Sequence, residues 1–206
     1  TNRRDCMQIM GYISAVMGGF QWADTRIFAQ DWAEIEAPYI EYLTTNPKLD
    51  ELLSALHVSE NPNRPVWSTR AMSVVEGYDT DFLVDYSAVY NYLIDRGHPL
   101  IIMSGIFDAH DGALSTYAWM KDELELEVDF WREARRIYYV EVEGKMTVGG
   151  YWHDNISSGG AFTVIALPKS GHYAPADNYD ASFSILKDAV EHGSLICRKD
   201  DCKVVN

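Results

Sequence analysis

The stretch PLIIMSGIFDAHDGALSTYAWM, residues 99–120, places an apolar run, a polar loop and a helical pattern one after another. The run from Leu100 to Met103 is typical of a strand that is covered on both faces. Helical spacing of apolar residues precedes it, over residues 79–96, and follows it, over residues 112–125. A helix, a buried strand and a second helix in succession predict an α/β sheet with helices on both faces.

The rest of the chain continues this alternation. We predict two helices (residues 9–18 and 46–58), a hairpin of strands (135–143 and 145–152) with the turn EGK, a buried strand (161–167) and a helix (180–192) closed by Gly193. The helix of residues 79–96 carries its buried stripe on Phe82, Tyr86, Val89, Tyr90 and Leu93. Tyr86, Tyr90 and Trp119 are assigned to the core, and YWHDN, residues 151–155, to a turn.

The composition excludes several classes of protein. In 206 residues, 31 acidic against 17 basic side chains give a net charge of −14, which makes nucleic acid an unfavourable partner. Hydrophobic residues at 47% and aromatic residues at 13% are enough for a packed core. The longest apolar runs fall short of the roughly 20 residues that a membrane span needs, so none is expected.

Three cysteines and one sequon point to an oxidising, secretory environment. Cys197 and Cys202 are close enough in sequence to bridge, which leaves Cys6 for a bond to another chain. Asn155 begins the glycosylation motif N-I-S in a polar, glycine-rich segment that we read as a turn. The chain begins at Thr1 without an initiator methionine or a signal peptide, so we expect a processed end.

Two loops that follow the predicted buried strands carry ionisable side chains. Asp108, His110 and Asp111 follow the first strand, and His172 follows the second. The carboxyl ends of strands in an open α/β sheet converge on a crevice, and an acid followed by a histidine is the chain order of an α/β-hydrolase triad. In such a triad the carboxylate orients the imidazole, which transfers the proton. Structural roles remain an alternative, since a loop aspartate often caps backbone N–H groups.

Other parts of a catalytic site are absent from this sequence. It contains no G-x-S-x-G nucleophile elbow, and neither Ser104 nor Ser170 has the flanking glycines at that spacing. A metal held by Asp108, His110 and Asp111 is set aside, because these residues lie on one loop with no second cluster. We therefore expect no metal and no cofactor, and a nucleophile from outside the chain.

The ordered motifs resemble those of the serine carboxypeptidase family over about residues 42–191. In residues 99–120 the family spacing is matched by Gly105, Asp108, Ala118 and Trp119. In the stretch VGGYWHDNISSGGAFTVIALPKSGHYAPADNY the matching positions are Gly150, Tyr151, Asn155, Gly171, His172, Pro175 and Asp177. The segment YLTTNPKLDELLSALHV is similar to a third family segment.

This resemblance implies a function and a division of the chain. Asp108 is the implied triad acid and His172 the implied base, while the family serine lies in a G-E-S-Y-G-G motif nearer the N-terminus. The chain is then the C-terminal half of a two-chain enzyme whose N-terminal chain carries the serine. Residues 1–78 would be the end of a helical cap insertion, and residues 79–206 the C-terminal part of the α/β-hydrolase core.

Two departures from the family pattern concern substrate binding. Tyr173 stands where methionine is frequent, and Asp111 stands where cysteine or an apolar residue is frequent. We expect a carboxylate there either to favour basic substrate side chains or to raise the pKa of a neighbouring acid. We expect a peptide substrate, a lysosomal, vacuolar or secreted location, and allow for a homodimer of the two-chain unit. Two alternatives stay open: an acyltransferase on the same scaffold, and a non-catalytic relative.

Overall fold

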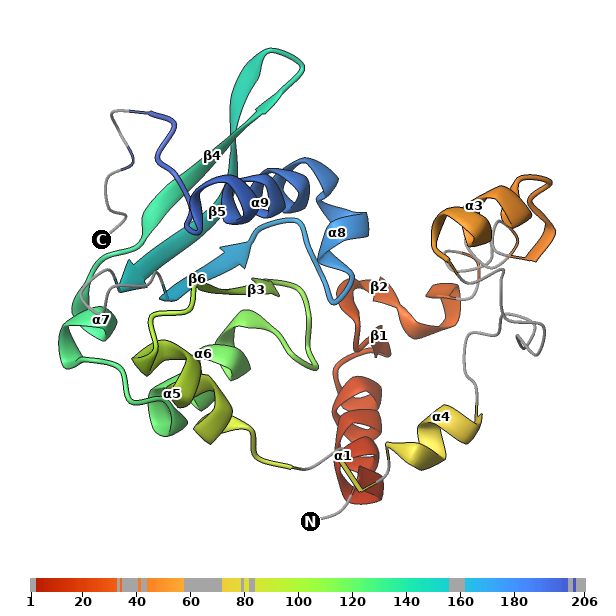
Figure 1. Ribbon diagram of the computed structural model, residues 1–206. Coiled ribbons are helices and arrows are strands. Elements are labelled where there is room, and N and C mark those ends of the chain that lie inside the picture. Colours follow the sequence, from red (N-terminus) through yellow and green to blue (C-terminus); the bar gives the residue numbers. More distant parts are fainter. Residues whose placement is uncertain are drawn as a thin grey trace. The chain divides into compact units, whose positions relative to one another are not determined.

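A mixed four-stranded sheet forms the framework of the second half of the chain in the computed structural model (Figure 1). Its strands are β3 (Leu100–Gly105), β4 (Arg136–Val142), β5 (Lys145–Asn155) and β6 (Phe162–Leu167). The strand order is β3-β6-β5-β4; β3 and β6 are parallel, and the other neighbours are antiparallel. Every residue of the central strand β6 is buried, as its mostly apolar sequence predicts. The expected α/β fold is confirmed.

The structure describes residues 3–32, 34, 41, 44–57, 72–78, 80–81, 84–155, 162–199 and 202. Three predicted features lie outside this set: the stripe residue Phe82, the second and third residues of the sequon, and the side chain of Cys6.

Helices cover both faces of the sheet (Figure 1). The helices of this half are α5 (Ser87–Asp95), α6 (Ala113–Glu123), α7 (Val128–Arg132), α8 (Ala174–Asp177) and α9 (Tyr179–His192). On one face Ala181 and Ile185 of α9 pack against Trp152 and Leu167. On the other face Met120 of α6 and Phe130 of α7 pack against Phe162 and its neighbours. Each face therefore has its own apolar core.

The helix predicted from residue 79 is shorter than expected. It begins at Ser87, because the Asp85 carboxylate accepts hydrogen bonds from the Ser87 backbone N–H at 2.8 Å and hydroxyl at 2.9 Å. This local bonding competes with a continued helix. The assignment of Tyr86 to the core is wrong, because Tyr86 and Val89 are exposed. Tyr90 packs edge-on against Trp119 with a centroid distance of 5.2 Å.

The prediction of a turn at residues 151–155 is wrong, because these residues form the end of β5. They pair with β6 from Tyr151↔Ala166 to Asn155↔Phe162. Two polar residues of this segment, His153 and Asp154, are buried, which obscures the alternation of a strand in the sequence. The turn of the hairpin lies instead at Glu143 and Gly144, within the predicted turn EGK, and both residues have positive φ.

The chain divides into two compact units: residues 1–21 with 27–84, and residues 22–26 with 85–206. The first unit includes α1 (Arg3–Val16), β1 (Phe20–Gln21), the short helix η1 (Ala29–Asp31), α3 (Leu49–Ala55) and α4 (Met72–Gly77). The boundary lies six residues beyond the expected 78/79 division. Residues 22–26 join the second unit because their backbone bonds to its loops, for example from the Thr25 N–H to the Phe107 carbonyl at 2.9 Å.

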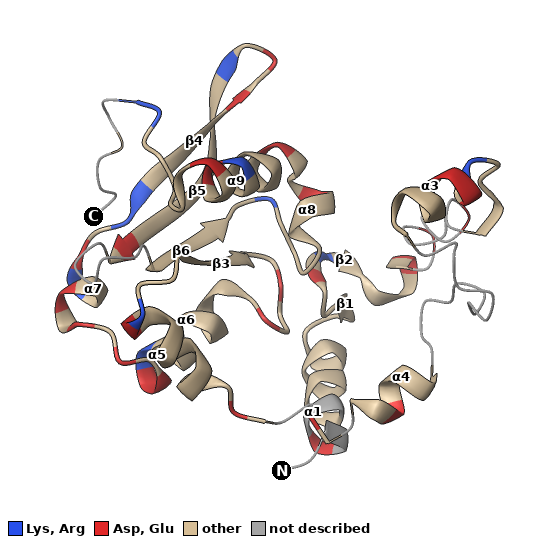
Figure 2. Cartoon of the chain, in the orientation of Figure 1, with Lys and Arg blue, Asp and Glu red and all other residues tan. Residues whose placement is uncertain are grey.

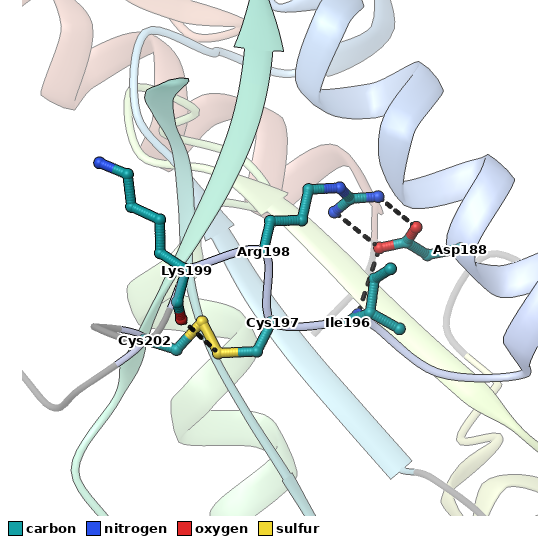
Figure 3. Close-up of a disulfide and its surroundings, with 6 residues drawn as sticks. All are labelled: Asp188, Ile196, Cys197, Arg198, Lys199 and Cys202. Atoms are coloured by element: carbon teal, nitrogen blue, oxygen red, sulfur yellow. Dashed lines mark hydrogen bonds and ion pairs between the residues drawn. A yellow bond between two sulfur atoms is a disulfide. The ribbon is translucent and has the colours of Figure 1, made fainter. Parts of the chain in front are cut away.

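A buried polar network fixes the segment after α9 to the sheet. Asp188 of α9, 1% exposed, accepts hydrogen bonds from the Tyr138 hydroxyl at 2.7 Å and from Arg198 at 3.0 Å. Burial is the main reason that the pKa of Tyr138 rises to about 12, so its hydroxyl stays protonated and donates. Figure 3 shows the Arg198 guanidinium directed at Asp188, beside the disulfide that joins Cys197 and Cys202.

Candidate active site

The two predicted site loops meet at the carboxyl ends of the parallel strands β3 and β6. The Ile106 N–H donates to the Leu167 carbonyl at 3.0 Å, and the Phe107 N–H donates to the Ser170 carbonyl at 2.9 Å. The loop of residues 106–112 leads into α6, and the loop of residues 168–173 leads into α8. The topology therefore brings together two segments that are far apart in the sequence.

Asp108 and His172 form a hydrogen-bonded pair across these loops. Nδ1 of His172 lies 3.0 Å from Oδ2 of Asp108. The Asp108 side chain is 4% exposed and that of His172 is 32% exposed. The acid is thus buried, while the imidazole reaches the surface of the described chain.

The backbone of the first loop holds the Asp108 carboxylate in place. Its Oδ1 accepts hydrogen bonds from the backbone N–H groups of His110 at 2.8 Å and Asp111 at 3.1 Å. Gly112 permits this tight turn, because a Cβ there would lie 1.9 Å from the Asp108 carbonyl oxygen. Oδ2 is left to accept from His172, which orients the imidazole.

The segment of residues 22–26 positions the histidine. The His172 N–H donates to the Ala23 carbonyl at 2.7 Å, and the Gly171 N–H donates to Oδ2 of Asp177 at 2.6 Å. The Trp22 ring lies edge-on to the His172 ring at a centroid distance of 5.6 Å. No local pattern predicted this contact, since residues 22–26 lie in the part expected to be helical.

An ion pair between Asp24 and Arg26 stabilises the segment of residues 22–26. Nε of Arg26 donates to Oδ1 of Asp24 at 2.9 Å, and the Arg26 Nη1 donates to the carbonyl of Lys169 at 2.9 Å. Burial by itself would raise the pKa of Asp24, but the hydrogen bonds and the charge of Arg26 outweigh it and lower the pKa. The guanidinium also lies over the Phe107 ring, 4.7 Å from its centroid. Arg26 thus links residues 22–26 to both site loops.

A comparison with known protein families identifies the family of this chain. The model of the serine carboxypeptidase family matches residues 17–192, which include both loops. The chain belongs to the serine carboxypeptidase family. No curated protein matches the chain. The family assignment supports a hydrolase of serine carboxypeptidase type.

Asp111 lies beside His110 on the first site loop. Its Oδ2 is 2.7 Å from Nδ1 of His110 and 3.7 Å from Nδ1 of His172. The side chain is 62% exposed. Tyr173 contacts His172 with a ring-centroid distance of 5.2 Å, and its side chain is also exposed. Both residues suspected of substrate contacts therefore border the imidazole.

A cavity of about 460 Å³ opens next to the acid. Asp108 forms part of its wall, with mostly apolar neighbours and the polar side chains of Ser115, Tyr117 and Arg135. The Arg135 guanidinium lies over the Tyr117 ring, 4.5 Å from its centroid. The space lies beside Asp108 and is of a size that accepts a side chain.

The remaining predicted site residues lie away from this pair. Asn155 is the last residue of β5, at a strand end and not in a turn. Cys197 and Cys202 are joined to each other after α9.

Figure 2 shows acidic residues on helices of both units, in keeping with the net charge of −14. Within the described residues no helix is long and apolar enough to span a membrane.

Proposed function

We propose that this chain supplies the acid and the base of a serine carboxypeptidase, with the nucleophilic serine on a separate N-terminal chain. The observation that carries the proposal is the 3.0 Å contact between buried Asp108 and His172 in a member of this family. Retention of this pair favours an enzyme over a non-catalytic relative.

The geometry suits general base catalysis. Asp108 accepts a hydrogen bond from the Nδ1–H of His172, which leaves Nε2 free to take a proton from the serine. The serine oxygen attacks the last peptide carbonyl, and His172 then gives the proton to the leaving amine. Water attacks the resulting acyl-enzyme with His172 again as base, and the shortened peptide is released. Asp108 stays ionised and stabilises the imidazolium at each transfer.

Two features support a partner chain that carries the serine. The sequence contains no G-x-S-x-G motif. Strand β3 stands at the edge of the four-stranded sheet, and its six residues, LIIMSG, are uncharged. An uncharged apolar edge strand pairs readily with another strand. We assign that position to the remaining hydrolase sheet of the N-terminal chain.

Several finer features belong to the same proposal. Asp111 would favour basic substrate side chains by its charge, and Tyr173 would border the substrate. Cys6 would join the partner chain, and Asn155 would carry a glycan. Both agree with a lysosomal, vacuolar or secreted enzyme.

Covalent labelling of the native two-chain complex tests the proposal. A fluorophosphonate should label a serine of the partner chain, because the reagent needs a nucleophile activated by a base. His172→Gln should abolish this labelling, whereas His192→Gln, on the surface of α9, should not change it. Labelling that persists in His172→Gln, or a native complex that does not label, would exclude the proposed role.

A second assay separates hydrolysis from acyl transfer. The complex should release the terminal residue of a blocked dipeptide in water. Asp108→Asn should lower kcat about 10⁴-fold, as the same change does in another serine protease triad. Asp129→Asn, whose side chain is 85% exposed, is the matched control. Transfer of the acyl group to an added alcohol in preference to water would identify an acyltransferase.

A further inference from the structure

We propose that His110, Asp111 and His172 form a binding site for a divalent transition-metal ion of the Zn²⁺ class, and that the bound ion blocks proton transfer by His172. The binding site stands on the geometry of this chain alone. Only the blocking effect rests on the proposed function.

The three side chains converge on one point from two loops. One ligand atom from each lies within 4.8 Å of the ligand atoms of the other two. Oδ2 of Asp111 is 2.7 Å from Nδ1 of His110 and 3.7 Å from Nδ1 of His172. Zn²⁺ binds histidine nitrogen and carboxylate oxygen at about 2.0–2.2 Å, so tetrahedral ligands lie about 3.4 Å apart. The two measured separations bracket this value.

Asp108 adds negative charge beside the site. Its Oδ2 lies 3.0 Å from Nδ1 of His172, while its Oδ1 is held by two backbone N–H groups. His110, Asp111 and His172 supply three of the four ligands that Zn²⁺ takes in proteins, and water can take the fourth position.

The ligand types select the metal. Imidazole nitrogen favours Zn²⁺, Co²⁺, Ni²⁺ and Cu²⁺, whereas Mg²⁺ and Ca²⁺ prefer a shell of oxygen atoms. The side chains of His110 and His172 are about one-third exposed, so an ion can reach them. The Trp22 ring lies beside both, at centroid distances of 5.2 and 5.6 Å, and limits access of water from one side.

The sequence argued against a metal because its candidate ligands lie on one loop, and the structure adds a ligand from a second loop. His110 and Asp111 are on one loop, and a single loop lacks a second cluster of ligands. His172 supplies that second contribution from the neighbouring strand end. The sequence predicts that the two loops meet, but the mutual distances of these ligand atoms follow only from the folded loops beyond the paired strands β3 and β6.

A bound ion would stop the proposed catalysis at a defined atom. Coordination through Nδ1 of His172 replaces the N–H group that otherwise donates a hydrogen bond to Asp108. A neutral imidazole bound in this way carries its one proton on Nε2, so Nε2 cannot take a proton from the serine. Zn²⁺ should therefore act as an inhibitor, not as a cofactor.

Metal titration of the native two-chain complex, after treatment with a chelator, tests the site. Calorimetry should detect tight binding of Zn²⁺, and Co²⁺ should give the visible absorption of a tetrahedral site, while Mg²⁺ and Ca²⁺ should produce neither signal. His110→Gln and Asp111→Asn should each weaken Zn²⁺ binding at least about tenfold, since even outer groups of metal sites contribute 10–100-fold. His192→Gln is the matched control, because its Nε2 also lies near a carboxylate, 3.8 Å from Glu191.

The outcomes separate this site from the proposed function. Zn²⁺ and Co²⁺ binding that is unchanged in both His110→Gln and Asp111→Asn would overturn the site. Binding as expected in a complex that no fluorophosphonate labels would leave the site standing and exclude the catalytic role. If the complex is active, His110→Gln and Asp111→Asn should each raise the Zn²⁺ concentration that gives half inhibition. The increase should match the increase in the dissociation constant for Zn²⁺ in the same variant. Turnover that is insensitive to saturating Zn²⁺ would overturn the blocking effect.

Discussion

Gly105 and Gly171 lie in direct contact where the two site loops leave the sheet. A Cβ on Gly105 would stand 2.1 Å from the Gly171 carbonyl oxygen and 2.6 Å from that of Ser170. No rotation of a side chain can relieve such a clash, because both neighbouring atoms belong to the backbone. The distance between Asp108 and His172 therefore depends on the absence of a side chain at position 105.

Gly105→Ala should consequently separate the two loops. We expect a loss of about 1–3 kcal/mol in the free energy of unfolding, the usual cost of overpacking. Peptidase activity should fall further, about 10²-fold, because a misplacement of about 1 Å has that effect on a catalytic pair. Urea unfolding and steady-state kinetics measure the two effects. Gly11→Ala in α1, where a Cβ meets open space, should instead be neutral or slightly stabilising.

The Asp24–Arg26 pair should make the protein sensitive to strong acid. Because the pKa of Asp24 is lowered in the folded state, its contribution to stability is complete above about pH 3.8 and is lost as the pH falls through the folded value. Asp24→Asn should cost about 1.5–3 kcal/mol at neutral pH, at the low end because Arg26 is partly exposed. The variant should also lose less stability below pH 4 than the wild type. Equal acid unfolding curves would contradict this assignment.

His153 should weaken the fold in mild acid. Burial, with the positive charges of Arg135 and Arg136, lowers the pKa of His153 from 6.5 to about 4. The unfolded chain therefore takes up a proton below pH 6.5 that the folded chain does not accept until about pH 4. This difference corresponds to roughly 3 kcal/mol lost over that range, of which about 2 kcal/mol is lost by pH 5.

Replacement by a neutral side chain isolates this effect. His153→Gln should change less in unfolding free energy between pH 7 and pH 5 than the wild type, by about 2 kcal/mol. The comparison uses the change of the unfolding free energy with pH. A loss of packing in the variant that is the same at every pH therefore does not affect it. His192→Gln on the surface of α9 should keep the wild-type slope, and a wild-type slope in His153→Gln would contradict the prediction.

The sequence predicted the elements whose signals are local. The apolar runs of β3 and β6, the hairpin and the helices α6 and α9 follow from residues that are near each other in the chain. The Asp108–His172 contact followed from a general property of parallel strands, whose carboxyl ends share one edge. Each of these predictions needed only periodicity and topology.

The contributions of residues 22–26 and His153 could not be predicted in this way. Trp22 and Arg26 act through contacts with loops more than 80 residues away, and nothing beside them in the sequence marks that role. Asp154 is polar but buried in an ion pair with Arg136, so the strand that contains both it and His153 resembled a turn. Long-range pairing of polar groups left no periodic pattern.

The Asp188 network should be the most sensitive site outside the active-site loops. Asp188→Asn would leave the Arg198 guanidinium without its buried counter-charge, and removal of one partner from such a pair costs about 3–5 kcal/mol. Tyr138→Phe removes one hydrogen bond to the same carboxylate, which keeps its contacts with Arg198 and the Ile196 N–H, so about 1.5–3 kcal/mol is expected. Urea unfolding of both variants under non-reducing conditions, which keep the Cys197–Cys202 bond intact, measures the order of the two losses. A loss in Tyr138→Phe that equals or exceeds that in Asp188→Asn would show that the tyrosine, not the ion pair, holds the segment after α9 to the sheet.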